Sequence, residues 1–182
     1  MQAVQDYSDG KAEQVIVKEQ TIDRYEDKLR SYLTKLSSQN LNYSDRQSVS
    51  TLMHCITEFE RISDHAVNVV ESVQEMNKRE QHFSKKAVEE MEVYKDAISD
   101  ILDRSVGAFV NADEELAKTV EPLEEVIDEL NKNVKKRHIK RLRKGKCTIE
   151  LGLVLSDIAT SYERVADHCS NIAVYMIQVQ DN

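Results

Sequence analysis

Two stretches of the chain carry the same polar side chains at the same spacing, and most of these side chains (Glu, Asp, His and Asn) are of types that bind cations. The first stretch reads Phe59-Glu-Arg-Ile-Ser-Asp-His-Ala-Val-Asn68, and the second, 103 residues later, reads Tyr162-Glu-Arg-Val-Ala-Asp-His-Cys-Ser-Asn171. Core packing alone would repeat apolar positions and has no need to repeat two carboxylates, an Arg, a His and an Asn. The chain is therefore predicted to be a tandem repeat whose repeated element is polar.

A Glu-x-x-x-Asp pair occurs twice in each repeat. The four pairs are Glu19/Asp23, Glu60/Asp64, Glu124/Asp128 and Glu163/Asp167. Residues four apart share one helix face, where two carboxylates repel each other by about 0.2–0.5 kcal/mol. If the pairs face inward they need a positive partner, and two helices that each supply Glu and Asp would surround a shared cation. All-oxygen ligands favour hard cations such as Mg, Ca, Mn or ferric iron.

The other repeated polar residues flank these pairs. Asn68 and Asn171 continue the same stripe, four residues after each Asp, whereas His65 and His168 are turned about a quarter turn away. These four residues are candidates for hydrogen bonds that orient the metal ligands. For the two histidines, however, a purely structural role with satisfied hydrogen bonds is the commoner outcome. A purely structural alternative pairs the carboxylates with Arg61 and Arg164. The same spacing also arises by chance, as in Glu92/Asp96/Asp100.

Apolar periodicity and capping residues predict an all-α fold. Helices are expected at about 8–38, 44–78, 84–111, 113–144 and 148–179, with a capping box at Ser44 and a kink or break at Pro122. With a shift of 105 residues, Ala12, Val15, Glu19, Ile22 and Asp23 fall on Ala117, Val120, Glu124, Ile127 and Asp128.

The expected domains are one repeat at 1–80, with two helices, and one at 81–182, with three. The first repeat thus lacks an opening helix. This favours the interpretation that the chain was cut from a longer one. It also predicts an exposed apolar groove that a partner covers.

Composition limits the function classes. With 4 Gly, 1 Pro and 32% charged residues, the chain suits long amphipathic helices. A net charge of −8 makes it a poor general binder of nucleic acid or anionic lipid. Three cysteines without a CxxC pair favour reduced thiols and a cytoplasmic setting. No stretch is apolar enough to cross a bilayer and no signal peptide is recognisable, so a soluble chain is expected. No Gly-rich phosphate loop, GxSxG or HExxH motif occurs, so no enzymatic activity is expected.

The segment 132–146 holds nine Lys and Arg residues and His138. It is of a type that could face phosphate, acidic lipid headgroups or an acidic partner, but basic residues in the C-terminal half of a helix also interact favourably with its dipole. It contains no interleaved aromatic residues for nucleic-acid stacking.

The stretches Glu60-Arg-Ile-Ser-Asp-His65 and Glu163-Arg-Val-Ala-Asp-His168, each followed by Asn, resemble the signature of the PhoU family. The resemblance covers nearly the whole chain from about Asp9. It implies a tandem repeat of three-helix bundles, antiparallel and spectrin-like, here without the opening helix. It also implies multinuclear iron or other metal clusters (Mg, Mn or Zn) on the bundle surface. One site would use Glu19, Asp23, Glu60 and Asp64, and the other Glu124, Asp128, Glu163 and Asp167.

The resemblance implies a regulatory role in phosphate uptake, in one of two settings. The stretch Gly145-Lys-Cys-Thr-Ile-Glu-Leu-Gly152 is similar to the cytoplasmic part of sodium/phosphate cotransporters. The alternative is a stand-alone regulator of an ABC phosphate transporter and its histidine kinase. In both, the expected partners are a transporter membrane domain or a signalling protein, and a second copy of the chain. Membrane association is expected to be only indirect. A helical adaptor without metal is the alternative of another class, and a carboxylate-bridged metalloenzyme is the third hypothesis.

Overall fold

The structure, a computed structural model, describes residues 8–180, except for the side chains of 179 and 180. Every element within this range is a helix: α1 (Asp9–Ser37), α2 (Tyr43–Lys78), α3 (Lys85–Asn111), α4 (Glu114–Ala117), α5 (Val120–Arg143) and α6 (Ile149–Gln180). The predicted all-α fold is confirmed. Among these helices, none has the combination of length and apolar character that crossing a bilayer requires.

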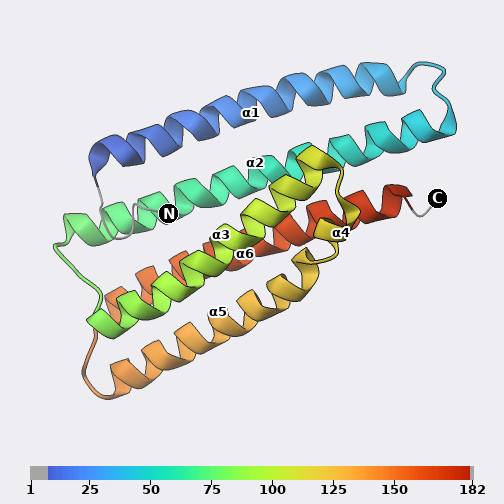
Figure 1. Ribbon diagram of the computed structural model, residues 1–182. Coiled ribbons are helices and arrows are strands. Elements are labelled where there is room, and N and C mark those ends of the chain that lie inside the picture. The colour runs from blue at the N-terminus through green and yellow to red at the C-terminus, as the bar shows by residue number, and fades with distance from the viewer. Residues whose placement is uncertain (1–7, 181–182) are drawn as a thin grey trace.

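The long helices α2 and α6 run antiparallel along the middle of the molecule (Figure 1). Helix α1 packs on α2, while α3 and α5 pack on α6 and on each other. The first repeat is therefore the pair α1 and α2, and the second repeat is the bundle of α3, α4–α5 and α6. The two repeats meet where α2 lies against α6.

Most helix ends lie where the capping residues predict them, with two differences. Ser8, Ser84 and Asp113 accept hydrogen bonds from the backbone N–H three residues later. Helix α2, however, is capped by Asn42 rather than Ser44, because the Asn42 side chain accepts the N–H of Asp45 at 2.8 Å. The expected 113–144 helix is broken at 118–119, before Pro122. Pro122 then stands in the first turn of α5, where its missing N–H costs no helical hydrogen bond.

Helix α3 closes the core of the second repeat. The Tyr94 hydroxyl donates to the Ala159 carbonyl at 3.0 Å, and the Ser105 hydroxyl donates to the Cys169 carbonyl at 3.3 Å. Both polar groups are buried, so each needs the partner that α6 provides. Apolar side chains of α3, α5 and α6 form one continuous core around them.

Within residues 8–180, the first repeat has no helix in the place of α3, as the sequence predicts. Large apolar side chains on α1 consequently face solvent, at spacings of three and four residues that place them on one helix face: Ile22, Tyr25, Leu29 and Tyr32. Among the apolar residues of α1, Leu33 is buried, whereas Ile22 and Leu29 are exposed.

Candidate metal centre

Three carboxylates of the second repeat converge between α5 and α6. One oxygen atom from each of Glu124, Asp128 and Asp167 lies within 4.8 Å of the others, and all three residues are half-buried. Glu124 and Asp128 are one turn apart on α5, so they present their side chains on one face, and Asp167 reaches them from the adjacent α6. Among the described residues, this is the one group of three or more acidic, His or Cys side chains with metal-binding separations.

The fourth residue predicted for this site, Glu163, lies one turn before Asp167 and is half-buried. Its charge acts together with those of Asp128 and Asp167 to raise the pKa of Tyr94, after the larger effect of burial. Glu163 is thus a neighbour of the converging group without being part of it.

The converging carboxylates are only partly neutralised by nearby cations. Asp167 pairs with Arg164 at 3.1 Å, and Asp128 lies 3.9 Å from Lys132. Burial first, and then the negative charges of Asp128 and Asp167, raise the pKa of Glu124 above its ordinary value. A carboxylate whose charged form is disfavoured in this way gains from a bound cation.

The donor set fits a hard metal ion. Three half-buried carboxylates supply only oxygen atoms, which Mg, Ca, Mn and ferric iron prefer. Asn131, three residues after Asp128, is buried, and its Oδ1 atom has no hydrogen-bond partner in the described part of the chain. This spacing places it on the same face of α5 as Glu124 and Asp128. The ion would be held by Glu124, Asp128 and Asp167, and the carboxylate of Glu163 would lie beside it.

The carboxylates predicted for the first site are less convergent. The pKa of Glu60 is raised by burial first, and then by the charges of Asp64 and Glu26, a hydrogen bond with Asp64, and the charge of Asp23. Asp23, Glu60 and Asp64 are therefore neighbours, but they do not form a three-carboxylate group of the kind found in the second repeat, within residues 8–180. Glu19 is half-buried one turn before Asp23, and its charge is not among the larger contributions to the Glu60 pKa.

A carboxylate outside the repeated motif distinguishes the first site. Glu26 is buried and forms an ion pair with Arg30, which also donates to the Thr57 hydroxyl at 2.9 Å. In the second repeat the equivalent contact joins Lys135 to the Thr160 hydroxyl at 3.1 Å, but Asn131 stands at the position of Glu26. The spacing of Glu26, three residues after Asp23, is a signal that could have identified it.

The repeated His and Asn residues of the second motif bind across the junction between repeats. His168 Nδ1 lies 2.6 Å from a Glu58 carboxylate oxygen, and the Asn171 side-chain amide donates to the same oxygen at 3.2 Å. Glu58 is buried, so it gains two polar partners from α6. Nothing in the repeat pattern marks Glu58, because Ser161 stands at its equivalent position.

The first motif lacks this partner. His65 and Asn68 lie 3.4 Å apart, Nδ1 to Nδ2, and the His65 ring stacks on the His168 ring with centroids 5.5 Å apart. His65 and His168 occupy equivalent positions in the two repeats, and α2 runs antiparallel to α6. A pseudo-two-fold axis therefore passes between the two rings. Arg61 is exposed and forms no ion pair within residues 8–180, whereas Arg164 pairs with Asp167.

Comparison with known proteins gives consistent matches. A family model described as the PhoU domain matches residues 1–73 and 84–176. The phosphate-specific transport system accessory protein PhoU homolog 1 of Thermotoga maritima is 27% identical over 132 residues, which cover 72% of this chain and 56% of that protein. The chain thus spans just over half the length of this relative. The PhoU homolog of Clostridium acetobutylicum is 23% identical over 183 residues, covering 97% of this chain and 82% of that protein.

Two solved structures share the fold. The crystal structure of PhoU from Pseudomonas aeruginosa superposes with a TM-score of 0.86 at 21% identity, covering 93% of this chain and 81% of that one. The phosphate transport system regulatory protein PhoU from Streptococcus pneumoniae gives a TM-score of 0.81 at 21% identity, covering 93% and 78%. At this level of identity, the structural likeness shows the fold alone.

Proposed function

We propose that this chain, which belongs to the PhoU domain family, regulates phosphate uptake by metal-dependent contact with a partner protein in the cytoplasm. The printed names of both curated relatives, which call them accessory proteins of phosphate-specific transport, support this role. The observation that carries the metal dependence is the convergence of Glu124, Asp128 and Asp167 on two adjacent helices.

The bound ion would tie α5 to α6 near the junction of the repeats. Asp167 would hold the ion from the position next to His168, and His168 Nδ1 lies 2.6 Å from a carboxylate oxygen of Glu58 in the first repeat. An ion that draws Asp167 towards Glu124 therefore acts on the turn of α6 that contacts α2. This short path gives metal occupancy a way to affect how the two repeats pack.

Two settings of the proposed role remain distinct. The names of the relatives favour an accessory protein of a phosphate transporter, while the stretch from Gly145 to Gly152 favours the cytoplasmic part of a sodium/phosphate cotransporter. The complete reading frame distinguishes them: upstream membrane helices would establish the cotransporter setting, and a free-standing frame would establish the accessory protein.

Genetic complementation tests the proposed function. In the native host, deletion of the gene is expected to raise phosphate uptake or the expression of phosphate-starvation genes when phosphate is plentiful. The wild-type gene and Asp96→Asn should restore the normal response, because Asp96 is an exposed carboxylate outside the candidate metal centre. Asp167→Asn should not restore it. A deletion that leaves both readouts unchanged would refute the regulatory role.

We also propose that the exposed apolar face of α1 forms a homo-oligomer contact. Ile22, Tyr25, Leu29 and Tyr32 present the spacing of an amphipathic helix that packs on another helix. Light scattering across a concentration series tests this: Ile22→Ser/Leu29→Ser should shift the protein to a smaller species, and an unchanged mass would exclude this face as the contact.

A further inference from the structure

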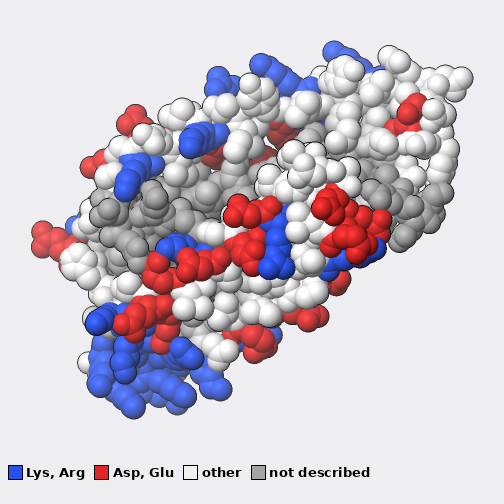
Figure 2. All heavy atoms as spheres, in the orientation of Figure 1, with Lys and Arg blue, Asp and Glu red and all other residues white. Residues whose placement is uncertain are grey.

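A cluster of basic side chains that the metal centre does not use covers the end of α5 and the turn into α6. Segment 132–146 contains nine of the 25 Lys and Arg residues of the chain and none of its 33 Asp and Glu residues. Figure 2 shows these side chains as one block at the lower left, where α5 ends in Figure 1, with acidic side chains spread over the rest of the visible face. The net charge of −8 therefore hides a segregated distribution.

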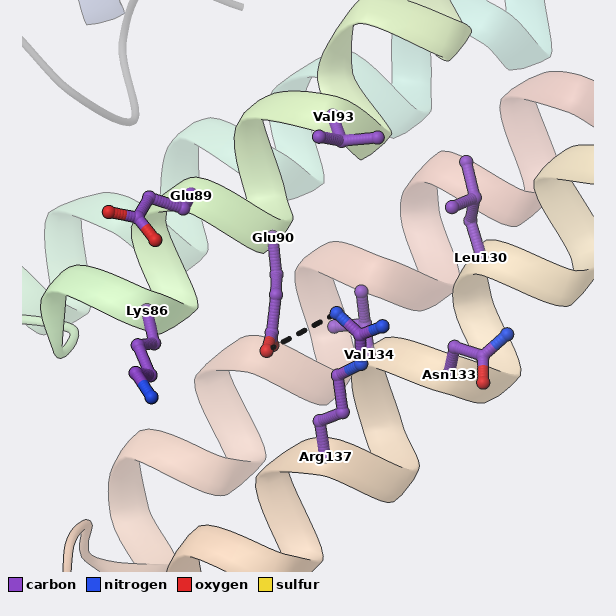
Figure 3. A pocket seen from close by; sticks show the side chains of 8 residues that line it. All are labelled: Lys86, Glu89, Glu90, Val93, Leu130, Asn133, Val134 and Arg137. Atoms are coloured by element: carbon purple, nitrogen blue, oxygen red, sulfur yellow. Dashed lines mark ion pairs between the residues drawn. The ribbon is translucent and has the colours of Figure 1, made fainter.

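Four of the nine cations already have partners. Lys132 pairs with Glu129 at 3.0 Å, and Lys135 donates to Thr160. Arg137 and Arg141 both pair with Glu90, at 3.6 Å and 2.7 Å. Figure 3 shows Glu90 and Arg137, joined by their ion pair, beside the 560 Å³ cavity between α3 and α5. Both arginines therefore already have a carboxylate partner.

The other five cations are exposed and form no ion pair within residues 8–180. We call them the basic tip: Lys136, Lys140, Arg143, Lys144 and Lys146. Lys136, Lys140 and Arg143 recur at spacings of four and three, so they project from one face of α5. The tip is thus an array of solvated charges at one end of the molecule rather than a pocket.

The helix dipole accounts for only part of this array. Its effect decays within the last turn of a helix. Lys140 and Arg143 stand in the last turn of α5, whereas Lys136 precedes it. Beside this end, Lys85 and Lys86 begin α3, whose first turn contains no acidic residue. Positive charge is unfavourable at a helix N-terminus, so the dipole of α3 does not explain these two lysines.

Exposed aliphatic side chains accompany the basic tip. Ile149 and Leu153, one turn apart on one face at the start of α6, are 64% and 62% exposed, and Ile139 on the face of Lys136 and Arg143 is also exposed. Basic residues interspersed with exposed aliphatic ones are typical of segments that lie at a membrane interface. Single-stranded nucleic acid would use aromatic residues for stacking, and purely electrostatic binding to an acidic partner would not use the aliphatic ones.

We propose that the basic tip, together with Ile149 and Leu153, binds the surface of an anionic lipid bilayer directly. The lysines and arginines interact with acidic headgroups, and the two aliphatic side chains enter the boundary between headgroups and acyl chains. This contact differs from the indirect membrane association expected from the sequence. It orients the molecule with the turn between α5 and α6 towards the lipid.

Vesicle co-sedimentation tests the proposal. The full chain is mixed with vesicles of phosphatidylcholine alone or with 30% phosphatidylglycerol, at low and at high salt. Binding is expected only to the anionic vesicles, and it should weaken as salt screens the charges. Replacing the five basic-tip residues by Gln should reduce the partition coefficient at least tenfold. Ile149→Ser/Leu153→Ser should reduce it severalfold without changing its salt dependence.

A matched control keeps the test specific. Replacing Lys18, Arg24, Lys28, Lys35 and Arg61 by Gln removes the same charge from exposed positions elsewhere, and should leave vesicle binding within about twofold of wild type if the tip is responsible. Circular dichroism verifies that each variant is folded. Equal binding to both vesicle types, or equal loss in the tip and control variants, would overturn the proposal. Competition by inorganic phosphate beyond that of chloride at matched ionic strength would also overturn it, by assigning the tip to free phosphate.

Discussion

The two repeats place equivalent apolar residues in opposite environments. Ile22 is 37% exposed, whereas Ile127, its equivalent, is 0% exposed; Leu29 is 44% exposed and its equivalent Val134 is 3% exposed. The difference is α3, which covers α5 and α6 but has no counterpart on α1 and α2 in the described part of the chain. The repeated pair of helices is therefore only two-thirds of a folding unit, and the third helix determines whether the pair has a complete core.

The same comparison extends to the polar residues. The second repeat brings three carboxylates together, whereas the first uses Glu26 in a buried pair with Arg30. His168 and Asn171 bind Glu58, whereas Ser161 offers His65 no carboxylate at the equivalent position. The second copy of the motif therefore contains the candidate cation site, while the first repeat supplies the carboxylate, Glu58, that joins the two repeats.

The largest expected difference concerns the two equivalent isoleucines. Ile127→Ala removes a fully buried side chain and should reduce the free energy of unfolding by about 2–5 kcal/mol. Ile22→Ala trims a partly exposed one and should cost less than about 1 kcal/mol. Urea denaturation of both variants measures the difference. Equal costs would mean that another chain covers α1 in solution.

A smaller difference is expected where the repeats meet. Glu58→Ala removes the buried acceptor of His168 and Asn171 and should reduce the free energy of unfolding by about 2–3 kcal/mol. Ser161→Ala, at the equivalent position, should cost less than about 1 kcal/mol. The same denaturation experiment compares them, and if the serine variant is the less stable of the two, the assignment of Glu58 as the joining residue is wrong.

The smallest effect is a pH dependence of the protein without metal. The folded structure raises the pKa of Glu124, so its contribution to stability is fully present below the unfolded pKa and is lost as pH rises through the folded pKa. In EDTA, the wild type should therefore gain stability relative to Glu124→Gln as the pH falls from 7 towards 5. Thermal melts of both proteins measure this difference in stability. A difference that does not change with pH would show that the folded structure does not disfavour the charged form of Glu124.

Sequence reasoning was most successful for local features. The five long helical segments follow from apolar periodicity and from caps such as Ser84 and Asp113, because these depend on neighbouring residues. The missing helix of the first repeat also followed from comparing the repeats. The exposure of Ile22 and Leu29 did not follow from the stripe of α1 alone, because an uncovered apolar face has the same periodicity as a buried one.

Long-range polar contacts were harder to predict. Glu58 and Glu26 carry distinct roles but stand where the other repeat has Ser161 and Asn131, so a search for repeated residues could not find them. The four predicted carboxylate pairs include Glu124, Asp128 and Asp167, which the structure brings close together. Which carboxylates converge depends on how far apart α5 and α6 pack, and this distance is set by the whole core rather than by the motif.

The central claim is that the second repeat contains the stronger cation site. Titration of the metal-free protein with Mn²⁺, followed by electron paramagnetic resonance of the free ion, tests it most directly in four proteins: wild type, Asp167→Asn, Asp64→Asn and Asp96→Asn. The tightest site should weaken at least tenfold in Asp167→Asn and remain within about twofold of wild type in the other two variants, since only Asp167 belongs to the converging group. Equal weakening in Asp64→Asn and Asp167→Asn, or no tight site in the wild type, would contradict the account.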